Sequence, residues 1–185
     1  MEAELSGEGR LSTRRVYDGK VLALDVDEVM EPGGVRATRE VVRHRGSVSA
    51  LPVRDDNSLI LVRQYRHAVG ESLWELPAGR LDQDETPEDG IQRELREEIG
   101  QRAERLEKMA FFYTTPGFCD EAMHLFRATG LVPDKAAADE DERIEIGTFT
   151  LDAAVAMIAT GELREGKTLI AVLLELDRRR REASR

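Results

Sequence analysis

One segment of the 185-residue sequence carries the strongest structural signal: Gly79-Arg-Leu-Asp-Gln-Asp-Glu85, seven further residues, and then Arg93-Glu-Leu-Arg-Glu-Glu-Ile-Gly100. A helix is predicted across its second half. Thr86 suits the N-cap because its side chain can accept a backbone hydrogen bond, and Pro87 suits the first helical position because its φ is already helical. Acidic residues follow at once, where they favour the positive end of the helix dipole. Gly100 is expected to close the helix.

The predicted helix combines an apolar stripe with a cluster of carboxylates. The stripe recurs at i, i+4 and i+8 and consists of Ile91, Leu95 and Ile99. Glu94, Glu97 and Glu98 fall within about 100° of one another and border that stripe. Three carboxylates so close together repel one another, and more strongly near a core, where water screens less. Arg93 and Arg96 offset part of this charge. The alternative is a hard divalent cation, because Mg²⁺ and Mn²⁺ select carboxylate oxygens.

The rest of the chain has an order of elements typical of an α+β domain. Strand patterns precede the helix and return after it, and turn signals at residues 31–34 and 54–58 indicate an antiparallel beginning. The predicted strands are residues 21–26, 35–42, 47–53, 59–64, 108–113, 123–128 and 143–149, and two later helices are residues 151–159 and 167–179. We expect helices packed on a sheet, residues 169–174 in the core, and frayed ends at residues 1–10 and 178–185.

The composition is that of a globular chain with an acidic surface. There are 27 Lys and Arg against 37 Asp and Glu, a formal charge of −10, and one cysteine. Such a chain lacks the general attraction for nucleic acid that Lys and Arg provide, so nucleic-acid binding is disfavoured. No apolar run approaches the ~20 residues of a membrane helix, so no membrane association is expected. One cysteine cannot build a disulfide framework and the N-terminus has no apolar leader, so a cytoplasmic location is predicted.

The negative charge is concentrated in two segments. Residues 80–104 hold nine acidic and four basic residues, and residues 134–145 hold six acidic and two basic residues. Residues 35–66 are net positive, with seven arginines against three acidic residues. Charge runs are usually solvated faces. The alternative is that the acidic segments converge on cations while the basic segment faces an anionic substrate.

The segment from Gly79 to Gly100 resembles the Nudix box of the Nudix hydrolases. Seven fixed identities and one aliphatic position match, and the one departure is Gln101, where the family usually has an aliphatic residue. The resemblance implies an α/β/α sandwich with a mixed central sheet, preceded here by an N-terminal antiparallel strand extension. We divide the chain into residues 1–45, a strand region used for dimerisation, and residues 46–180, the Nudix hydrolase domain.

The resemblance also assigns roles within the box. Glu94 and Glu98 match the family's metal-binding glutamates, the carbonyl of Ala78 is a further ligand, and Glu97 beside them is assigned to catalysis. The implied cofactor is Mg²⁺ or Mn²⁺, with more than one ion per site, which polarises phosphoryl oxygens and lowers the pKa of an attacking water. The structural residues of the motif are Gly79, Gly100, the ion pair of Glu85 with Arg93 and, outside the box, Pro116.

Outside the box the sequence resembles the ADP-ribose pyrophosphatase branch of the family. Pro116, fifteen residues after Gln101, matches the hallmark of that branch. Further matches are Arg39-Glu40, Val62-Arg-Gln-Tyr-Arg66 and Trp74-Glu-Leu-Pro-Ala-Gly79. The implied reaction is hydrolysis of the diphosphate of ADP-ribose to AMP and ribose 5-phosphate. The alternatives are another nucleoside diphosphate sugar, a dinucleotide, or a catalytically silent Nudix domain that only binds its ligand.

The acidic residues 138–146 resemble the late loop that supplies a catalytic glutamate in this branch. By this analogy Glu140 is the general base or positions the attacking water, and Glu142 is a metal ligand. The order of these two roles is open, and a neighbouring aspartate, Asp139 or Asp141, is an alternative. The alternative is that this segment is a solvated acidic turn with no catalytic role.

Substrate contacts are expected from four residues outside the box. Arg39 and Arg66 would hold the phosphates, because guanidinium groups match phosphate oxygens, or else form surface salt bridges. Tyr17 or Phe118 would stack on adenine, or else pack in the core or a loop. The three histidines and Cys119 share no ligand spacing, so no zinc site is predicted. The resemblance implies a homodimer in which the N-terminal strands pack across a two-fold axis and help build the partner's adenine pocket.

Overall fold

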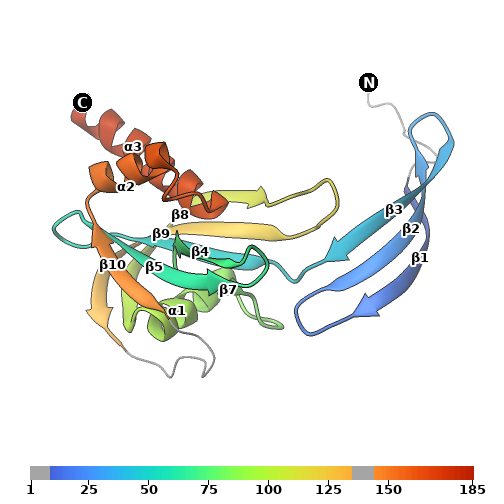
Figure 1. Cartoon of the computed structure of the whole chain (residues 1–185), viewed down its shortest axis with the longest axis horizontal. Helices are drawn as coiled ribbons and strands as arrows, with labels where there is room; N and C mark the ends of the chain where they lie inside the picture. The colour runs from blue at the N-terminus through green and yellow to red at the C-terminus, as the bar shows by residue number, and fades with distance from the viewer. Residues whose placement is uncertain (1–8, 135–143) are drawn as a thin grey trace. The chain divides into compact units, whose positions relative to one another are not determined.

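The computed structural model describes residues 9–134 and 144–185, and the chain divides into two compact units. The N-terminal unit comprises the chain up to Gly46 together with Phe112–Ala122. The second unit comprises Ser47–Phe111 and Met123–Arg185. Each unit is described by itself below, and Figure 1 gives the labels of the helices and strands.

The N-terminal unit is a three-stranded antiparallel sheet in the order β1-β2-β3. Its strands are β1 (Gly9–Asp18), β2 (Ala23–Glu31) and β3 (Val35–Arg43). The predicted turn between β2 and β3 is confirmed: Gly33 and Gly34 both have positive φ, and the Gly34 amide donates to the Glu31 carbonyl at 3.1 Å. Glycine suits both positions because side chains are rarely tolerated at positive φ. The segment Phe112–Ala122 joins this unit through a parallel bridge between Val42 and Cys119.

Strand β1 was missing from the sequence-based prediction, and the expectation that residues 1–10 are frayed is wrong for Gly9 and Arg10, which belong to it. Every residue of β1 is exposed, so the strand has no buried face to impose an alternating pattern. Register shifts occur between Arg10 and Ser12 and between Arg15 and Tyr17. These irregularities break the period of two that would have marked the strand.

The second unit consists of two sheets and three helices. One sheet is mixed, in the order β7-β4-β9-β8, and the other is antiparallel, in the order β10-β5-β6. In Figure 1, α1 lies against one face of the mixed sheet, whereas α2 and α3 lie on the other. The elements are β4 (Ser47–Pro52), β5 (Leu59–Arg66), β6 (Glu71–Glu75), β7 (Ala78–Arg80), α1 (Pro87–Glu98), β8 (Gln101–Tyr113), β9 (Ala122–Pro133), β10 (Glu145–Phe149), α2 (Leu151–Thr160) and α3 (Gly166–Ala183). The predicted α+β class, with a mixed sheet and an N-terminal antiparallel strand extension, is confirmed.

Strand β4 is the centre of the mixed sheet, and its pairing differs from the predicted one. The turn at residues 54–58 forms, with an antiparallel bridge between Val53 and Leu59, but β4 and β5 then part into different sheets. β4 pairs in parallel with β9, from Ser47 opposite Met123 to Pro52 opposite Ala128. Every residue of β4 is buried, because α1 contacts the strand from one side and α3 from the other. A strand covered on both faces is typical of parallel pairing.

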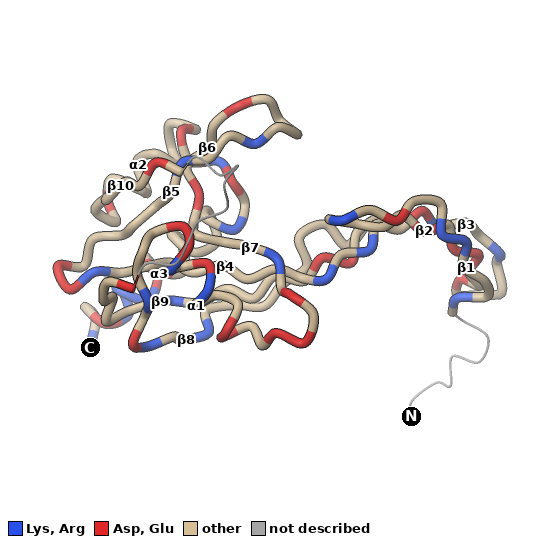
Figure 2. Tube along the Cα trace, turned by 90° about the horizontal axis from the view of Figure 1, so that it is seen from below, with Lys and Arg blue, Asp and Glu red and all other residues tan. Residues whose placement is uncertain are grey.

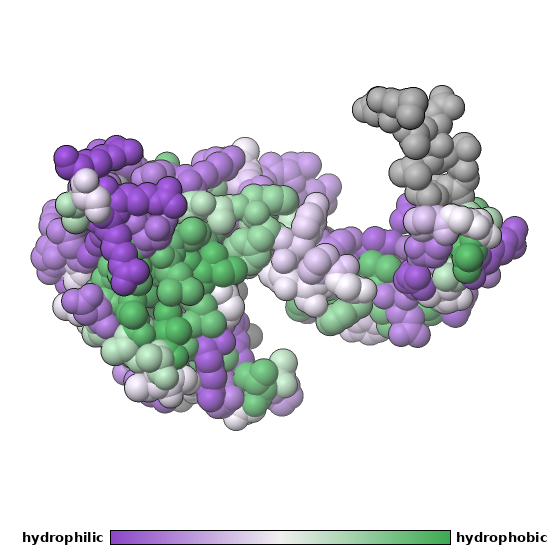
Figure 3. All heavy atoms as spheres, turned by 90° about the horizontal axis from the view of Figure 1, so that it is seen from above, coloured by the Kyte–Doolittle hydropathy of each residue, from purple (hydrophilic) through white to green (hydrophobic). Residues whose placement is uncertain are grey.

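The apolar stripe of the box helix packs into the main core, as predicted. Ile91, Leu95 and Ile99 are buried there with Phe126 of β9 and Val48 of β4. In contrast, the expectation that residues 169–174 form core is only partly met: Ala171 and Val172 are fully buried, but Leu173 is 50% exposed. On the side that carries α2 and α3, apolar atoms accordingly gather at the surface of this unit (Figure 3).

The predicted fraying of residues 178–185 is also wrong, because α3 continues to Ala183. Glu175 of α3 is completely buried and accepts hydrogen bonds from Arg178, Arg179 and Arg127, with N–O distances of 2.8 to 3.0 Å. Burial alone would raise the pKa of the Glu175 carboxyl, but these arginines lower it to about 2. The arginines at the end of the chain therefore hold the last turns of α3 in place, since a buried charge requires partners.

We expect Glu175→Gln to lower the free energy of unfolding by about 3 kcal/mol at pH 7, because the charge that the three arginines stabilise is lost. The folded pKa lies below the ordinary value of 4.5, so this contribution is present above about pH 4.5 and is lost as the pH falls toward 2. Urea denaturation at pH 7 and at pH 4 or below measures the difference, which must shrink with falling pH. Glu182→Gln, an exposed partner of Arg178, is the matched control and is expected to change stability by less than about 0.5 kcal/mol.

Among the described residues, no helix combines the length and the apolarity that crossing a bilayer would require.

Candidate active site

The box helix begins and ends as its sequence predicts, and this fixes where its carboxylates lie. The Thr86 side chain accepts a hydrogen bond from the Asp89 amide at 3.1 Å, and Pro87 is the first helical residue. Ile99 caps the last turn and Gly100 follows with φ 67°. In Figure 2, acidic residues gather in the loop between β7 and α1, directly before this helix. The apolar stripe of α1 packs in the core, and Glu94 and Glu98 face β7.

Arg93 is the hub of the charged side chains on α1. Its guanidinium donates to both carboxylate oxygens of Glu85 at 3.0 Å, to Glu94 at 2.6 Å and to Glu97 at 3.1 Å. A further bond reaches the Arg80 carbonyl at 3.0 Å. The hydrogen bonds with Glu85 raise the pKa of Arg93, and they hold the pKa of the Glu85 carboxyl below its usual value. The ion pair that the family resemblance implies is therefore present, and it ties the loop to the helix.

Glu94 and Glu98 are the two carboxylates that approach the backbone of β7. Glu94 is 8% exposed and Glu98 is 7% exposed. A Glu98 carboxylate oxygen accepts a hydrogen bond from the Ala78 amide at 3.3 Å. The Glu94 carboxylate lies against Gly79, where a Cβ atom would come within 1.8 Å of its Oε1. Only glycine leaves room for this carboxylate, which gives Gly79 a steric role that the sequence alone could not reveal.

The strand segment that carries Ala78 is anchored from three directions. The Pro77 carbonyl accepts hydrogen bonds from the Ser49 hydroxyl at 3.0 Å and from the Ala50 amide at 3.1 Å. The Leu76 amide donates to the Thr168 hydroxyl of α3 at 2.9 Å. Anchors on β4, α1 and α3 thus fix the backbone beside the glutamates, as a precise site requires.

The donor set here suits a hard divalent cation. Glu94 and Glu98 supply carboxylate oxygens, and the Ala78 carbonyl lies on the strand that both glutamates approach. Arg93 bonds Glu85, Glu94 and Glu97, whereas Arg96 donates to the Gln92 carbonyl. In residues 9–134 and 144–185, no three His, Cys, Asp or Glu side chains converge as a metal site. The described residues therefore offer two carboxylates beside the Ala78 backbone.

Arg66 of β5 lies next to this cluster. It donates to the Glu75 carboxylate through Nε at 2.9 Å and through Nη2 at 2.8 Å. This bidentate pair raises the pKa of Arg66, with a smaller electrostatic contribution from Glu98. Arg66 is the predicted phosphate-binding residue that the second unit supplies, and its side chain remains 40% exposed.

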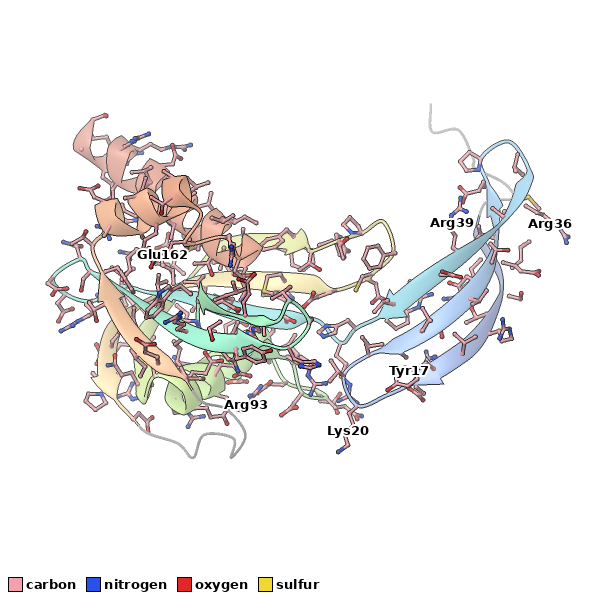
Figure 4. The ribbon with its side chains drawn as sticks, in the orientation of Figure 1. Tyr17, Lys20, Arg36, Arg39, Arg93 and Glu162 are labelled. Atoms are coloured by element: carbon pink, nitrogen blue, oxygen red, sulfur yellow. The ribbon has the colours of Figure 1, made fainter. Side chains whose placement is uncertain are left out.

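The other predicted substrate residues belong to the N-terminal unit. Arg39 pairs with Glu31 at 2.6 Å, and Tyr17 and Phe118 are exposed. The strand register sets Tyr17 opposite Leu24 and Arg39 opposite Asp27, so these two side chains project from opposite faces of the three-stranded sheet (Figure 4). Pro116 is an exposed turn residue of the same unit. Glu140 and Glu142 lie outside the described residues, as do Asp139 and Asp141.

Two charged residues near the site were absent from the prediction. Glu75 is 1% exposed, and Lys167 of α3 donates to it at 2.8 Å. The sequence does contain a signal for Glu75: an acidic residue between Trp74 and Leu76 in an apolar segment is expected to be buried and to need a charged or polar partner. No local signal identified that partner, because Lys167 lies 92 residues further along the chain.

Comparison with known proteins places the chain in a family. The model of the NUDIX domain matches residues 43–171. A methanol dehydrogenase activator of Bacillus methanolicus is 39% identical over 171 residues, which cover 91% of this chain and 92% of that protein. An ADP-ribose pyrophosphatase of Bacillus subtilis is 38% identical over 167 residues, which cover 89% of this chain and 90% of that protein.

The fold has a close counterpart among solved structures. The crystal structure of an ADP compounds hydrolase aligns with a TM-score of 0.82 at 22% sequence identity, covering 95% of this chain and 96% of that one. This match shows that the two chains share a fold, and the NUDIX domain model over residues 43–171 identifies the predicted Nudix-type architecture. The family model covers well over half of the chain, and its span contains the complete box with Arg93 at its hub, so the protein belongs to the Nudix hydrolase family.

Proposed function

We propose that this protein hydrolyses ADP-ribose to AMP and ribose 5-phosphate in the presence of a divalent cation. The observation that carries the proposal is the pair of buried carboxylates, Glu94 and Glu98, beside the Ala78 backbone in a chain 38% identical to an ADP-ribose pyrophosphatase. The resemblance of Pro116 and its surroundings to that branch supports the same substrate. We place the enzyme in the cytoplasm, as its single cysteine suggests.

In the proposed site Glu94, Glu98 and the Ala78 carbonyl hold Mg²⁺ or Mn²⁺, with more than one ion per site and Glu142 as a further ligand. When bound, the cations would polarise the phosphoryl oxygens and favour ionisation of a water molecule. Arg93 donates to Glu94, and it holds the loop through Glu85. We assign Glu97, at 3.1 Å from the same guanidinium, to catalysis at the edge of the cluster.

We propose that two residues of the second unit contact the substrate directly. Glu140, in the acidic segment, accepts a proton from the attacking water or positions it. Arg66 donates to a phosphate oxygen, and its bidentate bond to Glu75 orients it for this contact.

Replacing Glu140 by glutamine is expected to lower kcat strongly and to leave metal binding nearly intact. A change in KM alone would contradict the proposed role of Glu140 as general base or water-positioning residue.

The N-terminal unit is proposed to complete the site within a homodimer. In this proposal the N-terminal strands pack across a two-fold axis and help build the partner's adenine pocket. Tyr17 or Phe118 stacks on adenine, and Arg39 binds phosphate.

Incubation with ADP-ribose and Mg²⁺ tests the proposed function. We expect AMP and ribose 5-phosphate as equimolar products, and loss of turnover with excess chelator that added Mg²⁺ or Mn²⁺ reverses. A panel with GDP-mannose, another nucleoside diphosphate sugar, and NADH, a dinucleotide, compared by kcat/KM, establishes preference. If another panel member were turned over while ADP-ribose gave no AMP, the substrate assignment would be wrong. Absence of turnover for all of them would favour a silent binding domain.

A further inference from the structure

Lys167, near the start of α3, reaches into the sheet and shares a carboxylate with Arg66. Its Nζ lies 2.8 Å from Oε2 of Glu75, the same oxygen that accepts from Nη2 of Arg66 at 2.8 Å. Oε1 of Glu75 accepts from Nε of Arg66 at 2.9 Å. Glu75 is almost completely inaccessible, and the Lys167 side chain is 10% exposed. The three residues therefore form a buried charged group with one exposed member, Arg66.

The bidentate contact makes the orientation of Arg66 depend on that of Glu75. Two parallel N–H···O bonds require the guanidinium and the carboxylate to lie near one plane. Lys167 bonds the carboxylate from a separate element and so resists rotation of its plane. Because Nε and Nη2 are directed at Glu75, the Nη1 edge of Arg66 points away from it. Glu75, to which Arg66 is bonded, is three residues before Ala78, the residue whose backbone lies beside the proposed metal ligands.

Lys167 is itself firmly held. Glu165 caps α3 by accepting from the amides of Lys167 at 3.2 Å and Thr168 at 3.0 Å, and its carboxylate lies 3.2 Å from the Lys167 Nζ. The Thr168 hydroxyl donates to Glu165 at 2.7 Å and accepts from Leu76, the residue after Glu75. The start of α3 and the end of β6 are thereby joined at two neighbouring points.

Two carboxylates balance the charges of Arg66 and Lys167. Both cations bond Glu75, and Lys167 also pairs with Glu165 at 3.2 Å, so these four residues together carry no net charge. Arg66 is the most exposed of the four, with 40% of its side chain accessible. Burial would raise the pKa of Glu75, but the bonds from Arg66 and Lys167 hold it below its usual value, so the carboxylate stays ionised at neutral pH.

We propose that Lys167 is a positioning residue for substrate binding: through the shared Glu75 carboxylate it orients Arg66 toward the diphosphate of the substrate. Lys167 does not touch the substrate in this arrangement. The inference rests on the proposed function, since it names the residue that prepares Arg66 for a phosphate group.

A double-mutant cycle on Lys167 and Arg66 tests this coupling. We expect Lys167→Met to raise KM for ADP-ribose about tenfold with kcat changed less than about threefold, because only ground-state binding geometry is lost. Arg66→Ala should raise KM by about 10²-fold. In the Arg66→Ala background, Lys167→Met should change KM by less than about twofold, because its effect passes through Arg66.

Arg164→Met is the matched control. Arg164 directly precedes the N-cap of α3 and pairs with Glu71 of β6. Both partners of that ion pair are about half exposed, and although Glu71 is opposite Arg66 in the strand register, the Arg66 guanidinium bonds Glu75. We expect the KM of Arg164→Met for ADP-ribose to remain within about twofold of the wild-type value. An equal rise in KM for this variant would mean that any link between α3 and β6 matters, and would overturn the specific role of Lys167.

The outcomes separate this inference from the proposed function. A wild-type protein without turnover of ADP-ribose overturns both. An active wild type in which the two single effects on KM multiply in the double variant overturns only the role of Lys167, because a purely structural effect does not require Arg66. Should Lys167→Met fail to fold, Glu75→Gln takes its place in the cycle, with the same expected dependence on Arg66 and the same contradicting result.

Discussion

Replacing Glu98 by glutamine is expected to lower kcat/KM for ADP-ribose by at least about 10³-fold. Glu98 is 7% exposed and lies against the Ala78 amide, so its carboxylate is directed at the backbone that also carries the proposed carbonyl ligand. A glutamine keeps the shape but removes the charge that a divalent cation needs. Metal catalysis is worth several kcal/mol of transition-state stabilisation, and each 1.36 kcal/mol is a factor of ten.

The measurement is steady-state turnover together with Mn²⁺ binding by titration calorimetry. Glu88→Gln is the matched control, because Glu88 is on the same helix but is half exposed and pairs with Lys108 at 3.5 Å. We expect it to retain activity within about twofold. Full activity and unchanged Mn²⁺ affinity in Glu98→Gln would show that the metal ligands lie elsewhere.

Replacing Gly79 by alanine is expected to reduce kcat/KM by about 10²-fold or more. The added Cβ would come within 1.8 Å of Glu94 Oε1 and 2.1 Å of its carboxyl carbon, so the Glu94 carboxylate must leave its place. A displaced ligand weakens the cation site, and misplacement by about 1 Å is enough to cost two orders of magnitude in rate. The alanine itself touches neither substrate nor metal in the proposed site.

Gly166→Ala provides the control, because nothing lies within 4 Å of the corresponding Cβ position and its φ is not positive. Its activity and stability should match wild type. The decisive comparison is Mn²⁺ affinity: Gly79→Ala must bind the ion more weakly, whereas Gly166→Ala must not. Wild-type Mn²⁺ affinity in Gly79→Ala would show that the Gly79–Glu94 contact has no part in metal binding.

Some parts of the fold could be predicted because their causes are local. The helix Pro87–Glu98 depends on an N-cap, a proline, a regular apolar stripe and a closing glycine, all within fifteen residues. The same holds for the turn at Gly33 and Gly34. Strand β1 escaped prediction because none of its residues is buried, so its sequence carries no alternation.

Other parts depended on partners far along the chain. The turn after β4 suggested that β4 and β5 pair, yet β4 pairs with β9, some seventy-five residues later, because both its faces are covered by helices. The arginines at the end of the chain looked like a frayed terminus until Glu175 was seen to be buried beneath them.

The family and the residues of the box can be read from the sequence, because the spacing of glycine, arginine and glutamates is itself the motif. How those residues are held appears in the three-dimensional structure: Gly79 makes room for Glu94, Arg93 bonds three carboxylates, and Lys167 shares Glu75 with Arg66 across 92 positions of sequence. Helix caps and stripes arise from neighbours in the chain, whereas the pairing of buried charges is set by which elements the packing of the core brings together.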